Sequence, residues 1–257
     1  MKLEFLGTGA ADFNLERDEH MEGFRRFSSA LLDDTVLFDP GPHIFHYADT
    51  FQKTNLFDKV EHVLITHSHG DHLNMDSVKR LRELRPNCRF YGSEATGRHF
   101  AREQIPFTVL SIHSEYQIGN YLVTPLRSSH TGDFIDEITM VYSIVDGEGK
   151  KFFYGTDTGL FPEHTWKYIC NREYDLFVME LTIGDHPDAP HLFSHMTLSS
   201  FTLMINTMRR RYHPVKEGGT FLVTHLAKNW HKPHAELTEQ LAPLGVAPAY
   251  DGYVVEI

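Results

Sequence analysis

One short run of the chain, Thr66-His67-Ser68-His69-Gly70-Asp71-His72, places three imidazoles and a carboxylate within six positions. Imidazole and carboxylate together suit zinc, manganese or iron better than calcium or magnesium. A set of surface histidines beside a helix start is the plain alternative, but it does not account for so dense a pattern in a chain with 18 histidines among 257 residues. The run therefore predicts a metal site.

The secondary structure predicted around this run suits two ions rather than one. Residues 61–66 are predicted to form a buried strand, and a helix is predicted from His72 onward. His67 and His69 lie two positions apart in an extended segment, so their side chains point the same way and can bind one ion. A sharp turn at the intervening glycine would leave Asp71 and His72 at the helix start, where they can reach a second ion.

Length and composition fit one globular domain over residues 1–257. A content of 41% hydrophobic residues is enough for a substantial core. No apolar run approaches the ~20 residues that a membrane-spanning helix needs, and the N-terminal stretch reaches glycines too early for a signal peptide. Cys88 and Cys170 show no CxxC spacing, so we expect buried, reduced thiols and a cytoplasmic protein.

The formal net charge of −11 disfavours large nucleic acids as partners. Proteins that bind a polyanionic nucleic acid normally present a basic face. The basic clusters here are Arg25-Arg26 and Arg209-Arg210-Arg211, which solvated helix or loop surface explains equally well. A small anionic substrate at a metal site is compatible with this charge.

Strand-like and helical patterns alternate along the chain. The strand-like runs are rich in Val, Ile, Phe and Tyr, as half-buried sheet surface requires. They cover residues 3–6, 30–39, 60–66, 89–91, 121–127, 139–145, 151–155, 176–181, 220–224 and 253–257. Helices are predicted over residues 76–85, 93–103, 196–212 and 233–241. Strands with helices along both halves of the chain indicate a layered α/β domain.

Three further candidate ligands share one position relative to the predicted strands. His130, Asp157 and His225 each lie just beyond an apolar strand. A single loop histidine or turn aspartate is usually only polar surface. Together with the first cluster, however, the shared position predicts ligands of one site, because the sites of α/β folds gather at strand ends.

These motifs, in this order, resemble those of the metallo-β-lactamase superfamily. The resemblance covers essentially the whole chain and rests on Phe38-Asp39-Pro40-Gly41, His67-x-His69-x-Asp71-His72, His130, Asp157 and His225. It implies an α/β fold, the four-layer αβ/βα metallo-β-lactamase sandwich, with a dinuclear site at the sheet edges. It also implies that one ion is held by His67, His69 and His130, that the other is held by Asp71, His72 and His225, and that Asp157 bridges them. Asp39 would be a buried structural carboxylate and not a ligand.

A narrower resemblance is to the branch that contains tRNase Z and the phosphodiesterase that accompanies carbon–phosphorus lyase. It rests on Phe5-Leu6-Gly7-Thr8-Gly9, Val123-Thr124-Pro125-Leu126, Gly155-Thr156-Asp157-Thr158-Gly159-Leu160, Asp185-His186-Pro187, His195-Met196-Thr197 and Tyr250-Asp251-Gly252-Tyr253. In such phosphodiesterases the histidine that matches His195 lies beside the metals and serves the phosphate. Bacterial members can carry a cysteine-rich zinc site near the N-terminus, whereas residues 12–27 of this chain contain no cysteine.

The residues and the resemblance together predict a hydrolase that uses two divalent metal ions, zinc or manganese, with iron as a further option. The expected reaction is hydrolysis of a small phosphodiester, linear or cyclic, through a metal-bound hydroxide. Asp71 would hold the second ion and orient the hydroxide. His195, expected to open the helix 196–212, would protonate the departing alkoxide. The expected partner is thus a small-molecule phosphodiester; no membrane partner is expected, and a homodimer is left open.

Three other functions share parts of this pattern. A tRNA 3′-end-processing endonuclease has the same motifs, but it normally adds a long flexible arm and a basic surface that this sequence does not show. A thioester or lactone hydrolase shares the metal ligands but gives no reason for Gly7-Thr8-Gly9 or His195-Met196-Thr197. A non-catalytic metal-binding protein fits least, because all seven ligand positions are filled. Further candidates for pocket or supporting roles are His186, His191, His231 and His234.

Overall fold

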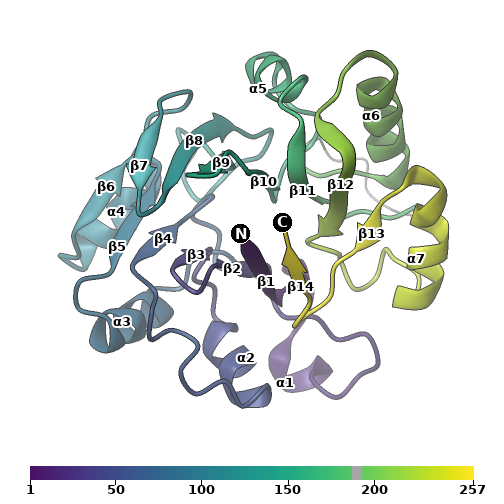
Figure 1. Ribbon diagram of the computed structural model, residues 1–257. Coiled ribbons are helices and arrows are strands. Elements are labelled where there is room, and N and C mark those ends of the chain that lie inside the picture. Colours follow the sequence, from purple (N-terminus) through teal and green to yellow (C-terminus); the bar gives the residue numbers. More distant parts are fainter. Residues whose placement is uncertain (187–192) are drawn as a thin grey trace.

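The strands form two mixed sheets whose inner faces pack against each other (Figure 1). The computed structural model describes residues 1–186 and 193–257. The first sheet has the order β14 (Val254–Glu256), β1 (Lys2–Gly7), β2 (Ser29–Leu32), β3 (Val36–Phe38), β4 (His62–Leu64), β5 (Arg89–Gly92) and β6 (Phe107–Val109). The second has the order β13 (Ala247–Pro248), β12 (Val215–Thr224), β11 (Tyr174–Glu180), β10 (Lys151–Gly155), β9 (Met140–Asp146), β8 (Tyr121–Arg127) and β7 (Tyr116–Ile118).

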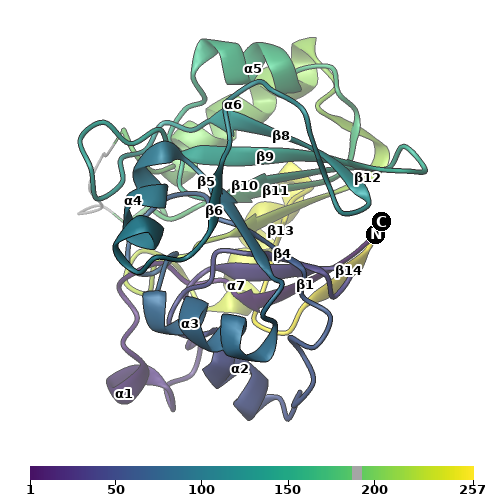
Figure 2. The ribbon, with the colours of Figure 1, turned by 90° about the vertical axis from the view of Figure 1, so that its left-hand side faces the viewer.

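Helices cover the outer faces of both sheets (Figure 2). The first sheet packs against α2 (Ile44–Thr50), α3 (Met75–Leu84) and α4 (Glu94–Arg102). The second sheet packs against α5 (Glu163–Ile169), α6 (Leu198–Arg211) and α7 (His234–Leu241), and the short helices α1 (Leu15–Asp18) and η1 (Ala242–Leu244) lie in connections. The order helix, sheet, sheet, helix confirms the predicted four-layer αβ/βα sandwich. Among the described residues, no helix combines the length and the apolar character needed to cross a membrane.

The apolar runs of the sequence become strands that are buried on both faces. In β10, Phe152 and Tyr154 belong to the core between the sheets, whereas Phe153 belongs to the core beneath the helices of the second sheet. This division follows because successive side chains of a strand point to opposite faces. A strand covered on both sides therefore needs a nearly continuous apolar sequence.

The prediction of one strand over residues 30–39 is wrong. The segment forms β2 and β3, which pair antiparallel, and the chain reverses at Asp33 and Asp34 with φ values of 46° and 60°. Aspartate tolerates a positive φ better than most residues, and tight reversals often need two such residues in succession. The Asp33-Asp34 pair was the signal for this turn.

Helix α6 begins two residues later than predicted, and α3 begins within one residue of the predicted range 76–85 but three residues after His72. Helix α3 begins at Met75 and not at His72, because the Asn74 side chain accepts a hydrogen bond from the backbone N–H of Ser77 and caps the helix. Helix α6 begins after Thr197, which caps it through a reciprocal pair of hydrogen bonds with the third residue of the helix. Asp71, His72 and His195 therefore lie in loops that precede helices and not within the first turn.

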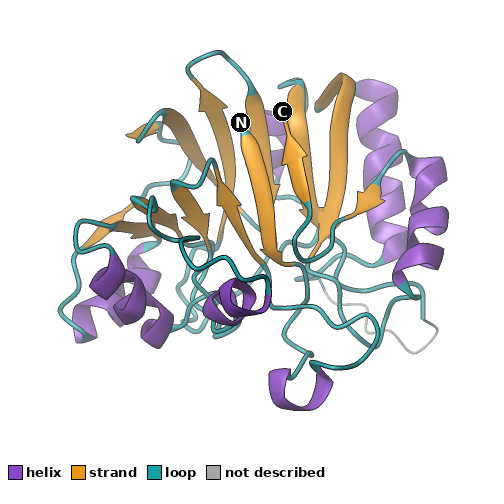
Figure 3. Cartoon of the chain, turned by 60° about the horizontal axis from the view of Figure 1, so that its bottom comes forward, coloured by secondary structure: helices purple, strands orange, loops and turns teal. Residues whose placement is uncertain are grey.

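A band of loops joins the strand ends of both sheets on one side of the molecule (Figure 3). A buried carboxylate, Asp251, secures one of these loops. It accepts hydrogen bonds from the backbone N–H of Thr8 at 3.0 Å and of Arg26 at 2.7 Å, and the Arg26 guanidinium lies 3.3 Å away. The carbonyl of Thr8 accepts a hydrogen bond from the N–H of Leu226 at 2.9 Å. The N-terminal loop is thereby held against the residue that follows His225.

We expect Asp251→Ala to lower the free energy of unfolding by about 3–5 kcal/mol, because the substitution removes the carboxylate that neutralises the buried Arg26 guanidinium. Urea denaturation followed by circular dichroism measures this change. Lys59→Ala is the matched control, since Lys59 forms a 3.4 Å ion pair with Asp34 but its side chain is 71% exposed. Loss of such an exposed pair costs at most about 1 kcal/mol. Similar losses in both variants would contradict the role given to Asp251.

Candidate metal centre

Histidine and aspartate side chains from both sheets meet in this band of loops. They follow strand ends, with His67, His69, Asp71 and His72 after β4, His130 after β8, Asp157 after β10 and His225 after β12. The backbones of Asp157 and His225 have φ values of 49° and 56°. Aspartate and histidine enter this left-handed region more readily than most residues, and it turns the chain sharply after the strand. The structure thus brings all seven predicted ligands together.

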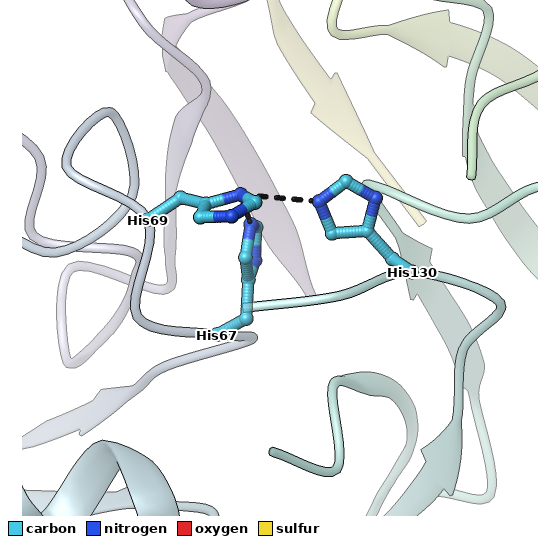
Figure 4. Close-up of side chains that lie close together, drawn as sticks. All are labelled: His67, His69 and His130. Carbon is cyan, nitrogen blue, oxygen red and sulfur yellow. Dashed lines mark hydrogen bonds between the residues drawn. The ribbon is translucent and has the colours of Figure 1, made fainter. Parts of the chain in front are cut away.

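Three histidine rings form the first group (Figure 4). Nδ1 of His69 lies 3.0 Å from Nε2 of His67 and 3.2 Å from Nε2 of His130. The loop of His67 and His69 belongs to the first sheet, and that of His130 belongs to the second. Imidazole nitrogens that carry no hydrogen can meet in this way only around a proton or a metal cation.

Asp39 determines which nitrogen of two histidines faces the site. Its carboxylate is fully buried and accepts hydrogen bonds from Nδ1–H of His72 and from the Thr66 hydroxyl, both at 2.9 Å. The Thr66 oxygen can then accept a hydrogen bond from Nδ1–H of His67, which is 3.1 Å away. With Nδ1 protonated, Nε2 of each ring presents a lone pair to the site. Asp39 therefore lies behind the ligands, as the resemblance implied.

Asp71, His72 and His225 form the second group. Nε2 of His72 lies 3.3 Å from Nε2 of His225 and 3.3 Å from Oδ2 of Asp71. The distance from Nε2 of His225 to the same carboxylate oxygen is 3.5 Å. Two imidazole nitrogens and a carboxylate oxygen around one point are a donor set that zinc and similar cations prefer.

Asp157 lies between the two groups. Its Oδ2 is 2.9 Å from Nε2 of His72 and 3.3 Å from Nε2 of His225. Its Oδ1 is 3.7 Å from Nε2 of His130. The two oxygens of this buried carboxylate thus face ring nitrogens of different groups, so Asp157 fits a bridge between two cations.

The electrostatics of the cluster favour bound positive charge. Burial lowers the pKa of His72, but the charges of Asp157 and Asp71 outweigh burial and raise this pKa well above its ordinary value. Burial raises the pKa of Asp157, yet the charges of His225 and His72 hold it well below the ordinary range. The carboxylates therefore stay ionised inside the protein. Together with the imidazoles they fit zinc, manganese or iron, and a bound cation would take the place of the proton on His72.

Sequence analysis missed Glu180, the last residue of β11. Its carboxylate is fully buried and accepts a hydrogen bond from Nδ1–H of His195 at 3.0 Å. It also accepts one from the hydroxyl of Thr182, whose oxygen lies 2.7 Å from Nδ1 of His225 and accepts that ring's N–H. Glu180 thus orients both His195 and His225. The available signal was a lone carboxylate at the end of an apolar strand.

His195 lies at the edge of the cluster. Its ring centroid is 4.8 Å from that of His130 and 5.5 Å from that of His225. Burial lowers the pKa of His195, but the charge of Glu180 outweighs burial and raises this pKa to about 9. Its side chain is 16% exposed and lines a cavity that opens onto the ligands. His195 is therefore placed to hold a proton at the cavity wall.

The cavity has a volume of about 330 Å³ and is lined by His69, Asp71, His130, Asp157, His195, His225, Trp230, Ala10, Ala11, Asp12, Thr182, Ile183 and Ala227. Two of the other candidate histidines lie next to it. The His186 ring packs edge-on against Trp230, with centroids 5.6 Å apart. The His231 ring donates a hydrogen bond to the carbonyl of Leu181 at 2.6 Å and supports the loop after β11.

The third candidate histidine with a described position, His234, does not add to the site. His234 begins α7, and its Nδ1 lies 3.0 Å from the guanidinium of Arg25, which places it outside the residues that line the cavity. His191 lies outside the described residues.

The sequence also matches a known family. Residues 34–225, more than half of the chain, match the beta-lactamase superfamily domain. The chain belongs to the metallo-β-lactamase superfamily. No curated protein matches it.

Solved structures of this superfamily have the same fold. A diphosphatase from the PhnP family has a TM-score of 0.74 and 20% sequence identity, and the match covers 100% of this chain and 96% of that chain. The protein YhfI from Bacillus subtilis has a TM-score of 0.73 and 17% identity, with coverages of 100% and 99%. The short form of human tRNase Z has a TM-score of 0.65 and 18% identity, with coverages of 100% and 99%. These similarities show the fold, and the family match over residues 34–225 shows the superfamily.

We expect Asp157→Ala to bind at most one of two metal ions and to lose nearly all hydrolytic activity, because the carboxylate between the groups has no substitute. Elemental analysis of the dialysed protein measures the metal content. Asp76→Ala, which removes an exposed aspartate of α3, is the control and should keep the wild-type metal content. Two bound ions in Asp157→Ala would contradict the bridging role.

Glu180→Gln tests the support of His225. The amide cannot serve as a charged acceptor for the Thr182 hydroxyl, so the orientation of the His225 ring should weaken. Substitution of such supporting partners typically lowers metal affinity about 10–100-fold. Titration against a chelating indicator should show this loss for one of the two ions. Unchanged affinity for both ions would mean that Thr182 orients His225 without Glu180.

Proposed function

We propose that this protein is a phosphodiesterase that hydrolyses a small phosphodiester, linear or cyclic, with two divalent cations held by the seven ligands. The observation that carries the proposal is His195, a histidine that Glu180 holds at the wall of the cavity next to the metal centre. An ester hydrolase needs a group that gives a proton to the departing oxygen. His195 has the position and the supporting carboxylate for this task.

Two divalent cations at this centre would lower the pKa of a water molecule and neutralise charge on a phosphoryl group. The protein's own residues supply the remaining chemistry. Asp71 lines the cavity, where its carboxylate can accept a hydrogen bond from the attacking water and orient it. His195 can donate a proton to the departing alkoxide, while Glu180 stabilises the charged ring.

The dimensions and the charge of the protein support a small substrate. A cavity of about 330 Å³ is near the lower end of the range for small-molecule sites. The net charge of −11 disfavours a long polyanion. Among the similar solved structures, one is named a diphosphatase and another a tRNase Z, which supports phosphoryl chemistry as the reaction class.

We expect His195→Ala to keep both metal ions and to lower kcat for an alkyl phosphodiester by about 10²–10⁴, the usual contribution of a general acid. A p-nitrophenyl ester should lose much less, because p-nitrophenolate leaves without protonation. Steady-state kinetics on the two esters, together with metal analysis, measures both effects. Metal loss would identify His195 as a ligand, and unchanged turnover of the alkyl ester would identify it as structural.

The charge also allows a test against the nuclease alternative. We expect no tight binding of tRNA and no cleavage at its 3′ end, because a net charge of −11 opposes the binding of a long polyanion. An electrophoretic mobility shift assay at low salt, followed by gel analysis of the RNA, measures both. Tight binding with cleavage at the 3′ end would favour the tRNA-processing function instead.

A further inference from the structure

A second, larger cavity begins at His130 and His195 and extends away from the metal ligands. Its volume is about 1030 Å³, and we refer to it as the outer groove. Its apolar walls include Ile112, Leu160 and Leu203, and the last two side chains are 55% and 65% exposed. His130 and His195 line both the outer groove and the cavity of the metal centre, so the two cavities adjoin at these side chains.

The charge of the outer groove differs from that of the rest of the protein. The chain has a net charge of −11, yet no carboxylate is among the described residues that line the outer groove. The ionisable residues there are Arg127, His113 and His164, besides the two histidines shared with the metal centre. Within the described part of the chain, the Arg127 guanidinium has no ion pair or hydrogen bond, and its residue is exposed. A free cation in an apolar groove is complementary to an anionic group.

The fold holds Arg127, His113 and His164 in place. Arg127 is the last residue of β8, three positions before His130. The backbone N–H of His113 donates to the carbonyl of Pro125 at 2.8 Å, which places its ring 6.1 Å from that of His164. The N-terminus of α6, with Thr197 and its neighbours, lines the same groove and adds the positive end of a helix dipole.

We propose that the outer groove binds the leaving-group half of the substrate, and that this half is an alcohol with an apolar body and a second anionic group, which Arg127 binds. This inference rests on the proposed function, because His195 marks where the departing oxygen lies. Water adds to phosphorus, the bond from phosphorus to the departing oxygen breaks, and that oxygen takes a proton. The free alcohol leaves from the outer groove, and the other half leaves as a phosphate monoester.

Two ethyl aryl phosphodiesters test the charge of the leaving group. One releases 4-hydroxybenzoate, and the other releases 4-hydroxybenzamide, which has a similar size but no charge. We expect the wild-type protein to have a higher kcat/KM for the charged ester. We define the charge preference as kcat/KM for the charged ester divided by kcat/KM for the neutral ester. Arg127→Gln should reduce this ratio by about tenfold or more, because the substitution removes a hydrogen bond between two charged groups, which is stronger than one between neutral groups. A third ester, whose leaving group carries a phosphate in place of the carboxylate, tests which anion Arg127 prefers. Its kcat/KM relative to the neutral ester exceeds that of the carboxylate ester if phosphate is preferred, and falls below it if carboxylate is preferred.

Arg172→Gln is the matched control, because Arg172 is also exposed but packs on Tyr168 outside the residues that line the outer groove. It should keep the wild-type ratio. An Arg127→Gln ratio equal to that of the wild type, or an equal fall of the ratio in both variants, would overturn the proposal.

A binding measurement separates this inference from the proposed function. Ligand-observed NMR of 4-hydroxybenzoate with chelator-treated protein reports occupation of the outer groove without catalysis. We expect its Kd to rise about tenfold or more in Arg127→Gln and to stay at the wild-type value in Arg172→Gln. If the wild type hydrolyses no phosphodiester but shows this difference in binding, the proposed function fails and the groove assignment stands. If it hydrolyses the esters but Arg127→Gln changes neither the ratio nor the Kd, the assignment fails and the proposed function stands.

Discussion

Two buried carboxylates, Asp39 and Glu180, hold the histidines in the arrangement that can bind metal. Each lies at the end of a strand, Asp39 after β3 of the first sheet and Glu180 in β11 of the second. Each accepts an N–H from one histidine directly and orients a second histidine through a threonine hydroxyl. Because an unpartnered buried charge costs several kcal/mol, these carboxylates and the rings that they orient depend on one another.

The sandwich supplies the stiffness that such an arrangement needs. Strand β11 is buried along its whole length. A shift of one residue in β11 would turn Glu180 to the opposite face and break its contacts with Thr182 and His195. Directly after several strands, the backbone turns sharply toward the metal centre. Asp39, like two of the ligands, has a positive φ, here 54°. A residue keeps this unfavourable backbone conformation only when the packing around it leaves no alternative.

Site residues were predictable from the sequence where the residue type indicates metal binding and the preceding apolar run indicates the end of a strand. His67, His130 and Asp157 were predictable because metal-binding side chains follow apolar strands. Glu180 was not predictable, because a carboxylate at a strand end has many uses and its partner comes 15 positions later, beyond a loop. The start of α3 was misplaced for a local reason, since Asn74 caps the helix more effectively than the residues before it. The outer groove combines residues from distant segments and left no pattern in the sequence.

The regions on the two sides of His130 and His195 differ in charge, and this difference would orient the substrate of the proposed reaction. On one side, Asp71 and Asp157 create a region that can hold cations, which in the proposed function would bind a phosphoryl group. On the other side, the outer groove has apolar walls, a free guanidinium and no carboxylate among its described lining residues. A phosphodiester with unlike halves would therefore bind preferentially in one orientation, with the apolar, anionic alcohol directed toward Arg127. His195 then faces the oxygen of that alcohol, so the electrostatics that position the substrate also select which ester bond is cleaved.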